Sequence, residues 1–481
     1  MKILFYNWIQ FDKKNNQGGG VNVYQKNLID FLIKNRKEYE IYFLSSGIYY
    51  NLFKNNVYIK ETKNIYGNKC RTFKMYNSPC IAPAKAMYNN IDTFMNDEET
   101  YNELVKFIKK FGEFDVIHFN NIEGVSTKCL EIKKDFPNTK VIYSVHNYCL
   151  FCPQINLFYN NKTNCLDYEN GKKCVSCIKN KENPKKFKTY YKIDNIAEKL
   201  NMDNFSNSLK IWLKKIYEKL KNKTTEGKEN EIDVNFSNSC EKFRKTNVER
   251  LNKYVDYVLS VSERVREICI QCGVKEEKVF NEYIGTKFAE KAQYKLNHEV
   301  NGEIFTISYM GYFEKMKGFD FLIEALEEIP DEMAKKIAFM CYAKVKSNED
   351  ELKIKKIEKL SNKLASAQHF NGYTHEQLKN IYSKIDLGIV PVIWEDNLPQ
   401  VAIEYAANGI PVLCSDLGGA HELSKAPEFV FKAGDKEDFK SKLENILNNK
   451  EILKRYFDNM IKLKTMEEHV SNIESYYNNK K

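Results

Sequence analysis

The stretch from residue 386 to residue 422 constrains the fold of this 481-residue chain more than any other segment. It reads DLGIVPVIWEDNLPQVAIEYAANGIPVLCSDLGGAHE: an apolar run, an acidic turn, an amphipathic segment and a second apolar run. Pro399 fits only the first turn of a helix, and Asn408-Gly409 is a typical helix stop. The segment therefore predicts strand, loop, helix and strand, and such strands form a right-handed parallel crossover.

Open parallel sheets bind their ligands beyond the carboxyl ends of the strands. Asp396 lies in the loop after the first predicted strand, and Glu404 lies on the helix that follows. Acidic residues near a helix N-terminus are also favourable capping charges, and for Asp396 alone this interpretation is about as good as a ligand site. The Gly418-Gly419 turn and the upstream Lys317 favour the ligand site.

This stretch resembles the donor-site signature of family 4 glycosyltransferases, which are retaining enzymes of the GT-B fold. Their pattern has two acidic residues separated by seven positions, a small-residue helix, a Gly-x-Pro-Val strand and a Gly-Gly turn followed by Glu. Asp396 stands where Glu is commoner and is one methylene shorter. The matching residues are Asp396, Glu404, Gly409, Pro411, Val412, Gly418, Gly419 and Glu422.

The domain organisation follows from the chain length and from this resemblance. A chain of 481 residues exceeds one ordinary core, so two domains and an insertion are expected. The resemblance implies an α/β protein of two Rossmann-like, doubly wound domains that face a cleft. We expect an acceptor domain at 1–298, with a helical insertion at about 149–246 and a cysteine cluster at 149–177. A donor domain at 303–464 and a helix at 465–481 that crosses back to the first domain complete the chain.

Glycines follow the first predicted strand, residues 2–8, at Gly18, Gly19 and Gly20. Such a loop lets the backbone approach a ligand and exposes the amide donors of the next helix. The motif is not GxGxxG, and a simple tight turn is about as consistent with it. The resemblance places Gly19 and Gly20 across the cleft from the donor phosphates.

A cation is expected at the start of the second domain. A predicted strand ends in Gly311, and Lys317-Gly318 precedes an amphipathic helix. A phosphate group can meet Lys317 at the N-terminus of that helix. The family has Arg where Tyr312 stands, so either Lys315 supplies the second charge or Tyr312 fits a different donor.

Two histidines, His118 and His146, end the predicted strands 115–119 and 140–145. An isolated histidine is usually structural, which is the interpretation we favour for His118. For His146 the resemblance implies a contact with the donor.

A cysteine cluster contains the motifs CLFC and CVSC, about twenty residues apart. Paired C-x-x-C motifs suit tetrahedral thiolate coordination. We expect Cys152, Cys165, Cys174 and Cys177 to bind a structural zinc ion and Cys149 to be spare. Reduced or disulfide-bonded thiols are the alternative.

A basic amphipathic pattern at 208–223, SLKIWLKKIYEKLKNK, suits a helix on an anionic membrane surface. A helix packed on its own domain with a solvated lysine face explains the pattern somewhat better. No apolar run of about 18 residues predicts a spanning helix. The opening residues 1–11 favour a buried strand over a signal peptide, and thirteen scattered cysteines indicate a reducing cytoplasm.

The resemblance implies transfer of a sugar from a UDP- or GDP-sugar to a hydroxyl of a glycan or lipid-linked acceptor, with retention and in surface polysaccharide or glycolipid assembly. Lys317 neutralises the diphosphate, Glu404 accepts ribose hydroxyls, and Asp396 and His146 contact the sugar. Cations and helix-end amides stabilise the leaving group, so no catalytic divalent metal is expected. The other donor-binding residues implied are Gly19, Gly20, Gly318, Lys315, Asn397, Leu398, Gly418 and Gly419.

Two alternatives remain open. A sugar-nucleotide epimerase of GT-B-like fold would need further acid and base groups and would consume donor without an acceptor. A zinc-containing basic nucleic-acid-binding protein would explain the cysteines and the net charge of +10. The lysine excess is diffuse and no aromatic-basic RNA motif occurs, so we expect no nucleic-acid partner.

Overall fold

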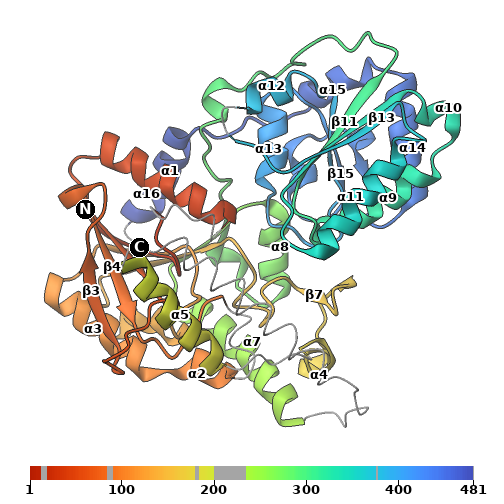
Figure 1. Cartoon of the computed structure of the whole chain (residues 1–481). Helices are drawn as coiled ribbons and strands as arrows, with labels where there is room; N and C mark the ends of the chain where they lie inside the picture. Colours follow the sequence, from red (N-terminus) through yellow and green to blue (C-terminus); the bar gives the residue numbers. More distant parts are fainter. Residues whose placement is uncertain (12–18, 84–89, 179–183, 200–233, 375–376, 480–481) are drawn as a thin grey trace.

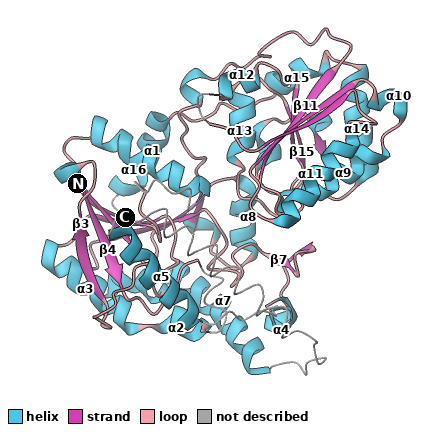
Figure 2. Ribbon diagram, in the orientation of Figure 1, coloured by secondary structure: helices cyan, strands magenta, loops and turns pink. Residues whose placement is uncertain are grey.

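The fold is described from a computed structural model, which shows two α/β domains, each built on its own sheet (Figures 1 and 2). The structure describes residues 1–11, 19–83, 90–178, 184–199, 234–374 and 377–479.

The sheet of the first domain has the strand order β10-β9-β6-β5-β1-β2-β4-β3, and its neighbours are parallel except in the β3–β4 pair. The central strands are apolar on both faces because helices cover both. Ile3 and Phe5 of β1 pack with α1 and α16, while Leu4 and Tyr6 face the core that includes α3. The strands are β1 Lys2–Tyr6, β2 Glu40–Ser45, β3 Tyr58–Thr62, β4 Cys70–Tyr76, β5 Val116–Phe119, β6 Lys140–Val145, β9 Tyr257–Ser260 and β10 Val279–Asn281.

The helices of this domain begin where the sequence supplies caps. The Asp97 carboxylate accepts a bond from the Thr100 amide at the start of α3, and the Ser262 hydroxyl accepts one from the Val265 amide in α8. The helices are α1 Gly19–Asn35, α2 Ile91–Asn96, α3 Glu98–Phe111 and α8 Glu263–Gln271, with α4 Lys172–Cys177, α5 Pro184–Lys199 and α7 Val234–Tyr254 between β6 and β9.

The segment between β6 and β9 is tied to the domain by its last helix, α7. Arg250 of α7 is buried and donates to Glu131 Oε1 at 2.7 Å, to the Met95 carbonyl oxygen at 2.8 Å and to Thr127 Oγ1 at 2.8 Å. A small hairpin, β7 Phe158–Tyr159 with β8 Thr163–Asn164, precedes α4. Helix α7 is therefore a packed part of the first domain.

The second domain has a parallel sheet of order β13-β12-β11-β14-β15-β16. The predicted crossover is present, because β14 pairs in parallel with β15 and α13 connects them. The strands are β11 Phe305–Gly311, β12 Ile337–Ala343, β13 Ser366–Phe370, β14 Leu387–Val390, β15 Val412–Ser415 and β16 Val430–Phe431. The helices are α9 Phe319–Glu328, α10 Asp331–Ala334, α11 Asn348–Leu360, α12 Leu378–Tyr382, α13 Gln400–Ala407, α14 Lys436–Asn448 and α15 Ile452–Asp458.

The last helix, α16 Met466–Asn478, packs on the first domain (Figure 1). Its Glu474 carboxylate accepts two bonds from the Arg36 guanidinium, at 2.7 and 3.0 Å. Its Tyr477 hydroxyl lies 2.7 Å from His118 Nδ1 at the end of β5. The chain therefore ends against the sheet with which it began.

Candidate functional site

The carboxyl ends of the two sheets face each other, and the loops beyond them join the domains. The Asn397 side-chain amide, in the loop after β14, donates to the carbonyl oxygen of Val145 at the end of β6 (3.4 Å). Gln400, the first residue of α13, donates to the Gly20 carbonyl oxygen at the start of α1 (2.8 Å). The edge at which such sheets bind ligands is therefore also the junction between the domains.

Lys317 and Asp396 meet at this edge. Nζ of Lys317 lies 2.6 Å from Oδ2 of the buried Asp396 and 5.4 Å from the centroid of the Trp394 ring. Gly318 adopts a left-handed φ of 74°, and a Cβ there would lie 1.6 Å from the Pro391 carbonyl oxygen. Only glycine fits this turn, and the turn sets Lys317 beside the N-terminus of α9.

The Gly418-Gly419 turn packs directly on the acidic loop. The Gly418 amide donates to Glu395 Oε2 at 3.1 Å, and the Gly419 amide donates to the Asp396 carbonyl oxygen at 2.9 Å. A Cβ on Gly418 would lie 2.1 Å from that same carbonyl oxygen, and one on Gly419 would lie 2.5 Å from the Asn397 carbonyl oxygen. These glycines allow the turn to hold Asp396 in place.

Glu404 lies on α13, half-buried, and its partner is the Tyr382 hydroxyl, which donates to Oε2 at 3.2 Å. Burial raises the pKa of Glu404 to about 7, although the Tyr382 bond opposes the shift. No described hydrogen bond or ion pair links it to Lys317 or Asp396. The carboxyl group therefore titrates nearer to neutral pH than an exposed glutamate does.

The two histidines have different surroundings. His118 is buried between Tyr477 and Ser144, whose hydroxyl lies 2.8 Å from Nε2, so it is a structural residue. The His146 ring lies against the ring of Tyr24, with centroids 5.0 Å apart and the planes tilted by 45°, and its buried Nε2 has no hydrogen-bond partner among the described residues. Burial lowers the pKa of His146 to about 3, so the imidazole is neutral.

The remaining predicted donor residues surround this edge. Gly19 opens α1 with a φ of 56°, and no atom of the described residues lies within 4 Å of where its Cβ would stand. Lys315 is exposed on the short turn before Gly318, and Leu398 is buried in the acidic loop. Tyr312 stands where the resemblance of the sequence predicts an arginine, and the Lys346 ammonium lies 3.8 Å from the centroid of its ring. A cation is therefore present there, but it comes from another loop.

The sequence did not predict two contacts that join the domains here, an ion pair between Arg264 and Glu395 and a cap that Glu422 forms on α8. Arg264 of α8 donates to both carboxylate oxygens of the buried Glu395, at 3.0 and 2.6 Å. Glu422 accepts from the amides of Glu263 and Arg264 and from the Tyr283 hydroxyl. The side chains come from positions more than a hundred residues apart, so no local pattern indicates them.

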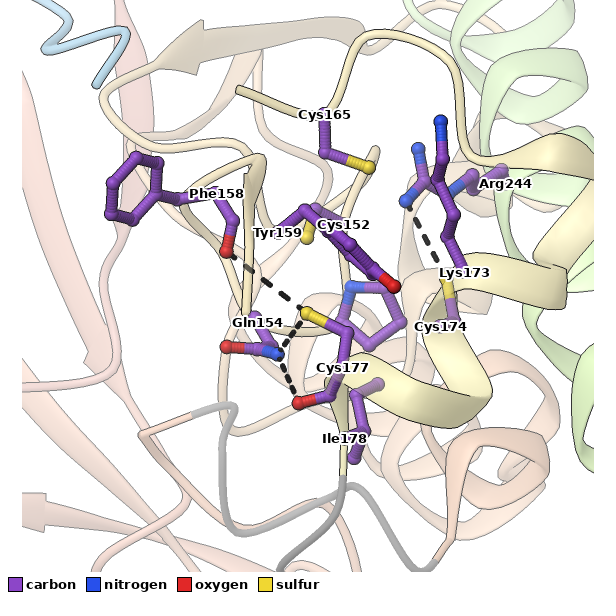
Figure 3. Close-up of a pocket in the computed structure, with 11 residues that line it drawn as sticks. Cys152, Gln154, Phe158, Tyr159, Cys165, Lys173, Cys174, Cys177, Ile178 and Arg244 are labelled. Carbon is purple, nitrogen blue, oxygen red and sulfur yellow. Dashed lines mark hydrogen bonds between the residues drawn. The ribbon is translucent and has the colours of Figure 1, made fainter. Parts of the chain in front are cut away.

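The four cysteines predicted as metal ligands line one small pocket in the first domain, together with Arg244 of α7 (Figure 3). Arg244 is 5% exposed; its Nη2 lies 3.7 Å from Cys174 Sγ and its guanidinium lies 3.9 Å from the Tyr168 ring centroid. Hydrogen bonding from Cys240 and the charge of Arg244 lower the pKa of the Cys174 thiol.

This arrangement does not support the predicted zinc site at Cys152, Cys165, Cys174 and Cys177. Within the part of the chain that the structure describes, no group of three or more His, Cys, Asp or Glu side chains is placed to hold a metal ion. Cys177 Sγ has protein donors instead: Gln154 Nε2 lies 2.7 Å and the Asn160 amide 3.2 Å from it. All thirteen cysteines are free thiols.

No helix among the described residues is long and apolar enough to cross a membrane. The predicted basic helix at 208–223 lies outside the described residues.

Residues 290–462 match a family model described as "Glycosyl transferases group 1". The match covers the second domain and includes Lys317, Asp396 and Glu404. No curated protein matches the chain.

Solved structures match almost the whole chain. They include Anabaena HepE in complex with UDP and glucose (13% identity, 99% of each chain, TM-score 0.55) and sucrose-phosphate synthase from Thermosynechococcus elongatus (14% identity, 99% of this chain and 98% of that one, TM-score 0.59). A glycosyltransferase from Rickettsia africae also matches (13% identity, 99% and 97%, TM-score 0.57). The chain has the GT-B fold. The predicted GT-B architecture is thus confirmed, whereas membership of family 4 stays a prediction.

Proposed function

We propose that this chain is a glycosyltransferase that moves a sugar from a UDP- or GDP-sugar to an acceptor hydroxyl with retention of anomeric configuration. The observation that carries the proposal is the Lys317–Asp396 pair at the N-terminus of α9, within the segment similar to glycosyl transferases group 1. HepE, which shares the fold at low identity, was solved with UDP and with UDP-glucose. This likeness supports UDP-sugars as donors, and GDP-sugars are included because of the resemblance of the sequence.

The site is suited to a leaving diphosphate. The Lys317 ammonium and the first amides of α9 offer positive charge at one place, and in a partly buried site such groups stabilise developing negative charge strongly. On donor binding, Lys317 turns towards the phosphate oxygens and frees Asp396 to accept hydroxyls of the donor sugar. Gly19 and Lys315 lie at the rim of this diphosphate site.

His146 and Glu404 complete the donor site in this proposal. The unpartnered Nε2 of the neutral His146 imidazole exchanges a hydrogen bond with a sugar hydroxyl. The Glu404 carboxylate accepts bonds from the ribose hydroxyls in place of the Tyr382 hydroxyl. Asn397, Leu398 and the Gly418-Gly419 turn shape the pocket around the sugar.

In the proposed reaction the acceptor oxygen attacks the anomeric carbon on the face that the diphosphate leaves. The acceptor proton passes to the departing phosphate oxygen, so neither a protein nucleophile nor a divalent metal is required. The acceptor is a glycan or a lipid-linked sugar in polysaccharide or glycolipid assembly, reached in the lipid case at an anionic membrane surface. This part rests on the resemblance of the sequence alone.

A thermal-shift screen tests the proposal. A donor at a hundredfold excess over its dissociation constant stabilises the folded protein by about 2.7 kcal/mol. UDP, GDP and their sugars are compared in the wild type, in Lys317→Ala and in a control, Lys335→Ala, which removes an exposed lysine of the same domain. We expect one nucleotide family to stabilise the wild type and the control but not Lys317→Ala. Equal shifts in all three proteins would refute the assignment of Lys317.

A further inference from the structure

A second cavity, of about 580 Å³, lies between the domains beside α8 and is within the size range of small-molecule sites. Figure 1 shows α8 where the two domains meet. Asn281 and Tyr283 line it from the first domain, and His421 and Lys425 line it from the second. Of the described residues around it, only Glu422 belongs to the donor-site pattern, and its carboxylate caps α8 and accepts from Tyr283. Lys317, Asp396 and Glu404 do not line this cavity, so it is distinct from the Lys317 site.

Two of the side chains that line this cavity each carry a buried polar atom that lacks a partner among the described residues. Neither Oδ1 of Asn281 nor Nδ1 of His421 has a hydrogen bond among the described residues. The Tyr283 hydroxyl on the same wall is already used, because it donates to Glu422 at 2.5 Å. A buried polar atom without a partner costs about 1–3 kcal/mol, so a molecule that supplies both partners gains that energy.

The cavity also offers charge and an apolar wall. The Lys425 ammonium is exposed and has no ion pair or hydrogen bond within the described part of the chain. One side of the cavity is apolar and consists of Pro427, Val430 and Ile461. Besides Glu422, which caps α8, the cavity has one carboxylate, Glu263, and this carboxylate is paired with Arg266 at 2.9 Å. Apolar CH groups, hydroxyls and a negative charge would all find complementary groups here.

We propose that this cavity binds a sugar that carries an anionic group. The sugar ring lies on Pro427 and Val430, its hydroxyls pair with Asn281 Oδ1 and His421 Nδ1, and its phosphate or carboxylate pairs with Lys425. Because the ligand touches both domains, it binds best when Glu422 caps α8, as in this structure. This site does not depend on the proposed transfer reaction.

Titration calorimetry of the full chain tests the site with glucose 6-phosphate, glucuronate, glucose and inorganic phosphate at millimolar concentration. We expect one of the two anionic sugars to bind at least about fivefold more tightly than glucose, with Lys425→Ala removing that preference. Asn281→Leu and His421→Leu should each weaken binding about tenfold, since each leaves a ligand group unpaired. Lys317→Ala should bind these ligands like the wild type, because it lies in the donor site.

Three results would overturn the proposal. The first is that none of the sugars binds. The second is that the wild type, Lys425→Ala, Asn281→Leu and His421→Leu all bind the sugars with equal affinity. The third is that inorganic phosphate binds as tightly as glucose 6-phosphate. The last would show an anion site without sugar recognition. Lys425 is exposed, so Lys425→Ala leaves the core unchanged and stays informative even where a leucine variant fails to fold.

Discussion

Replacing Glu404 by glutamine should stabilise the protein at alkaline pH, because the native site holds this carboxyl group in surroundings that oppose its charge. The pKa of Glu404 is about 7, against an ordinary value of 4.5, and burial is the main cause. Each pH unit between the two values corresponds to about 1.4 kcal/mol of unfolding free energy. The ionised carboxylate therefore lowers the free energy of unfolding by about 3 kcal/mol.

The sign follows from proton binding. Below pH 4.5 both the folded and the unfolded chain hold the proton, so the ionisation of Glu404 contributes nothing to the free energy of unfolding. Between pH 4.5 and about 7 only the folded chain keeps it, so the free energy of unfolding falls as the pH rises. Above pH 7 both states are ionised and the full penalty applies. Glutamine carries no charge and can still accept the Tyr382 bond, so it escapes the penalty.

Urea unfolding of the wild type and Glu404→Gln at pH 5 and pH 8 measures this effect. We expect the variant to exceed the wild type by about 2–3 kcal/mol at pH 8 and by less than about 1 kcal/mol at pH 5. The control, Glu358→Gln, changes an exposed glutamate of α11 and should match the wild type at both pH values within about 0.5 kcal/mol. A Glu404→Gln variant that is no more stable at pH 8, or equally stabilised at both pH values, would refute the reasoning.

Three further outcomes follow from the site. Gly418→Ala should lower the free energy of unfolding by about 1–3 kcal/mol in urea titrations, because its Cβ would lie 2.1 Å from the Asp396 carbonyl oxygen at a φ of 70°, whereas Gly302→Ala, with no atom nearer than 3.5 Å, should not. Glu395→Gln should cost about 1–3 kcal/mol by the same measure, because a neutral amide replaces the buried carboxylate that accepts two bonds from Arg264; an unchanged value would show that this ion pair is inert. Asp396→Asn should tighten UDP binding severalfold in calorimetry while donor turnover falls, because Lys317 loses its competing carboxylate; weaker binding would contradict the proposed exchange of partners.

The crossover around α13 was predictable because its signals are local. Apolar runs give β14 and β15, Pro399 precedes the helix, and Gly409, at a φ of 74°, ends it. The edge strands were not predictable by the same means. Strand β3 reads YIKET, with no fully buried residue, so its sequence lacks the apolar pattern that marks the central strands.

Some features of the site also have a local signal in the sequence, whereas others depend on residues far away in the chain. The four cysteines predicted as zinc ligands line one pocket but form no metal site among the described residues. Arg244 enters that pocket from α7, about seventy residues later, and no spacing rule includes it. His118 and His146 end neighbouring strands and look alike in sequence. Helix α16 returns to the first domain and supplies Tyr477 as a partner for His118. Nε2 of His146 receives no such partner from the described residues.

The loop 395–400 contains Asp396 of the proposed donor site and also makes contacts between the domains. Glu395 holds Arg264, Asn397 holds the end of β6, and Gln400 holds the start of α1. Asp396 lies within this loop and holds Lys317. Asp396 is flanked by two residues that contact the other domain, Glu395 and Asn397. A donor that draws Lys317 away from Asp396 therefore changes the bonding next to these contacts, so we expect nucleotide binding and domain closure to be coupled. Because coupling is reciprocal, Arg264→Ala should weaken UDP binding although Arg264 lies outside the proposed donor site, and an unchanged affinity would show that the two are independent.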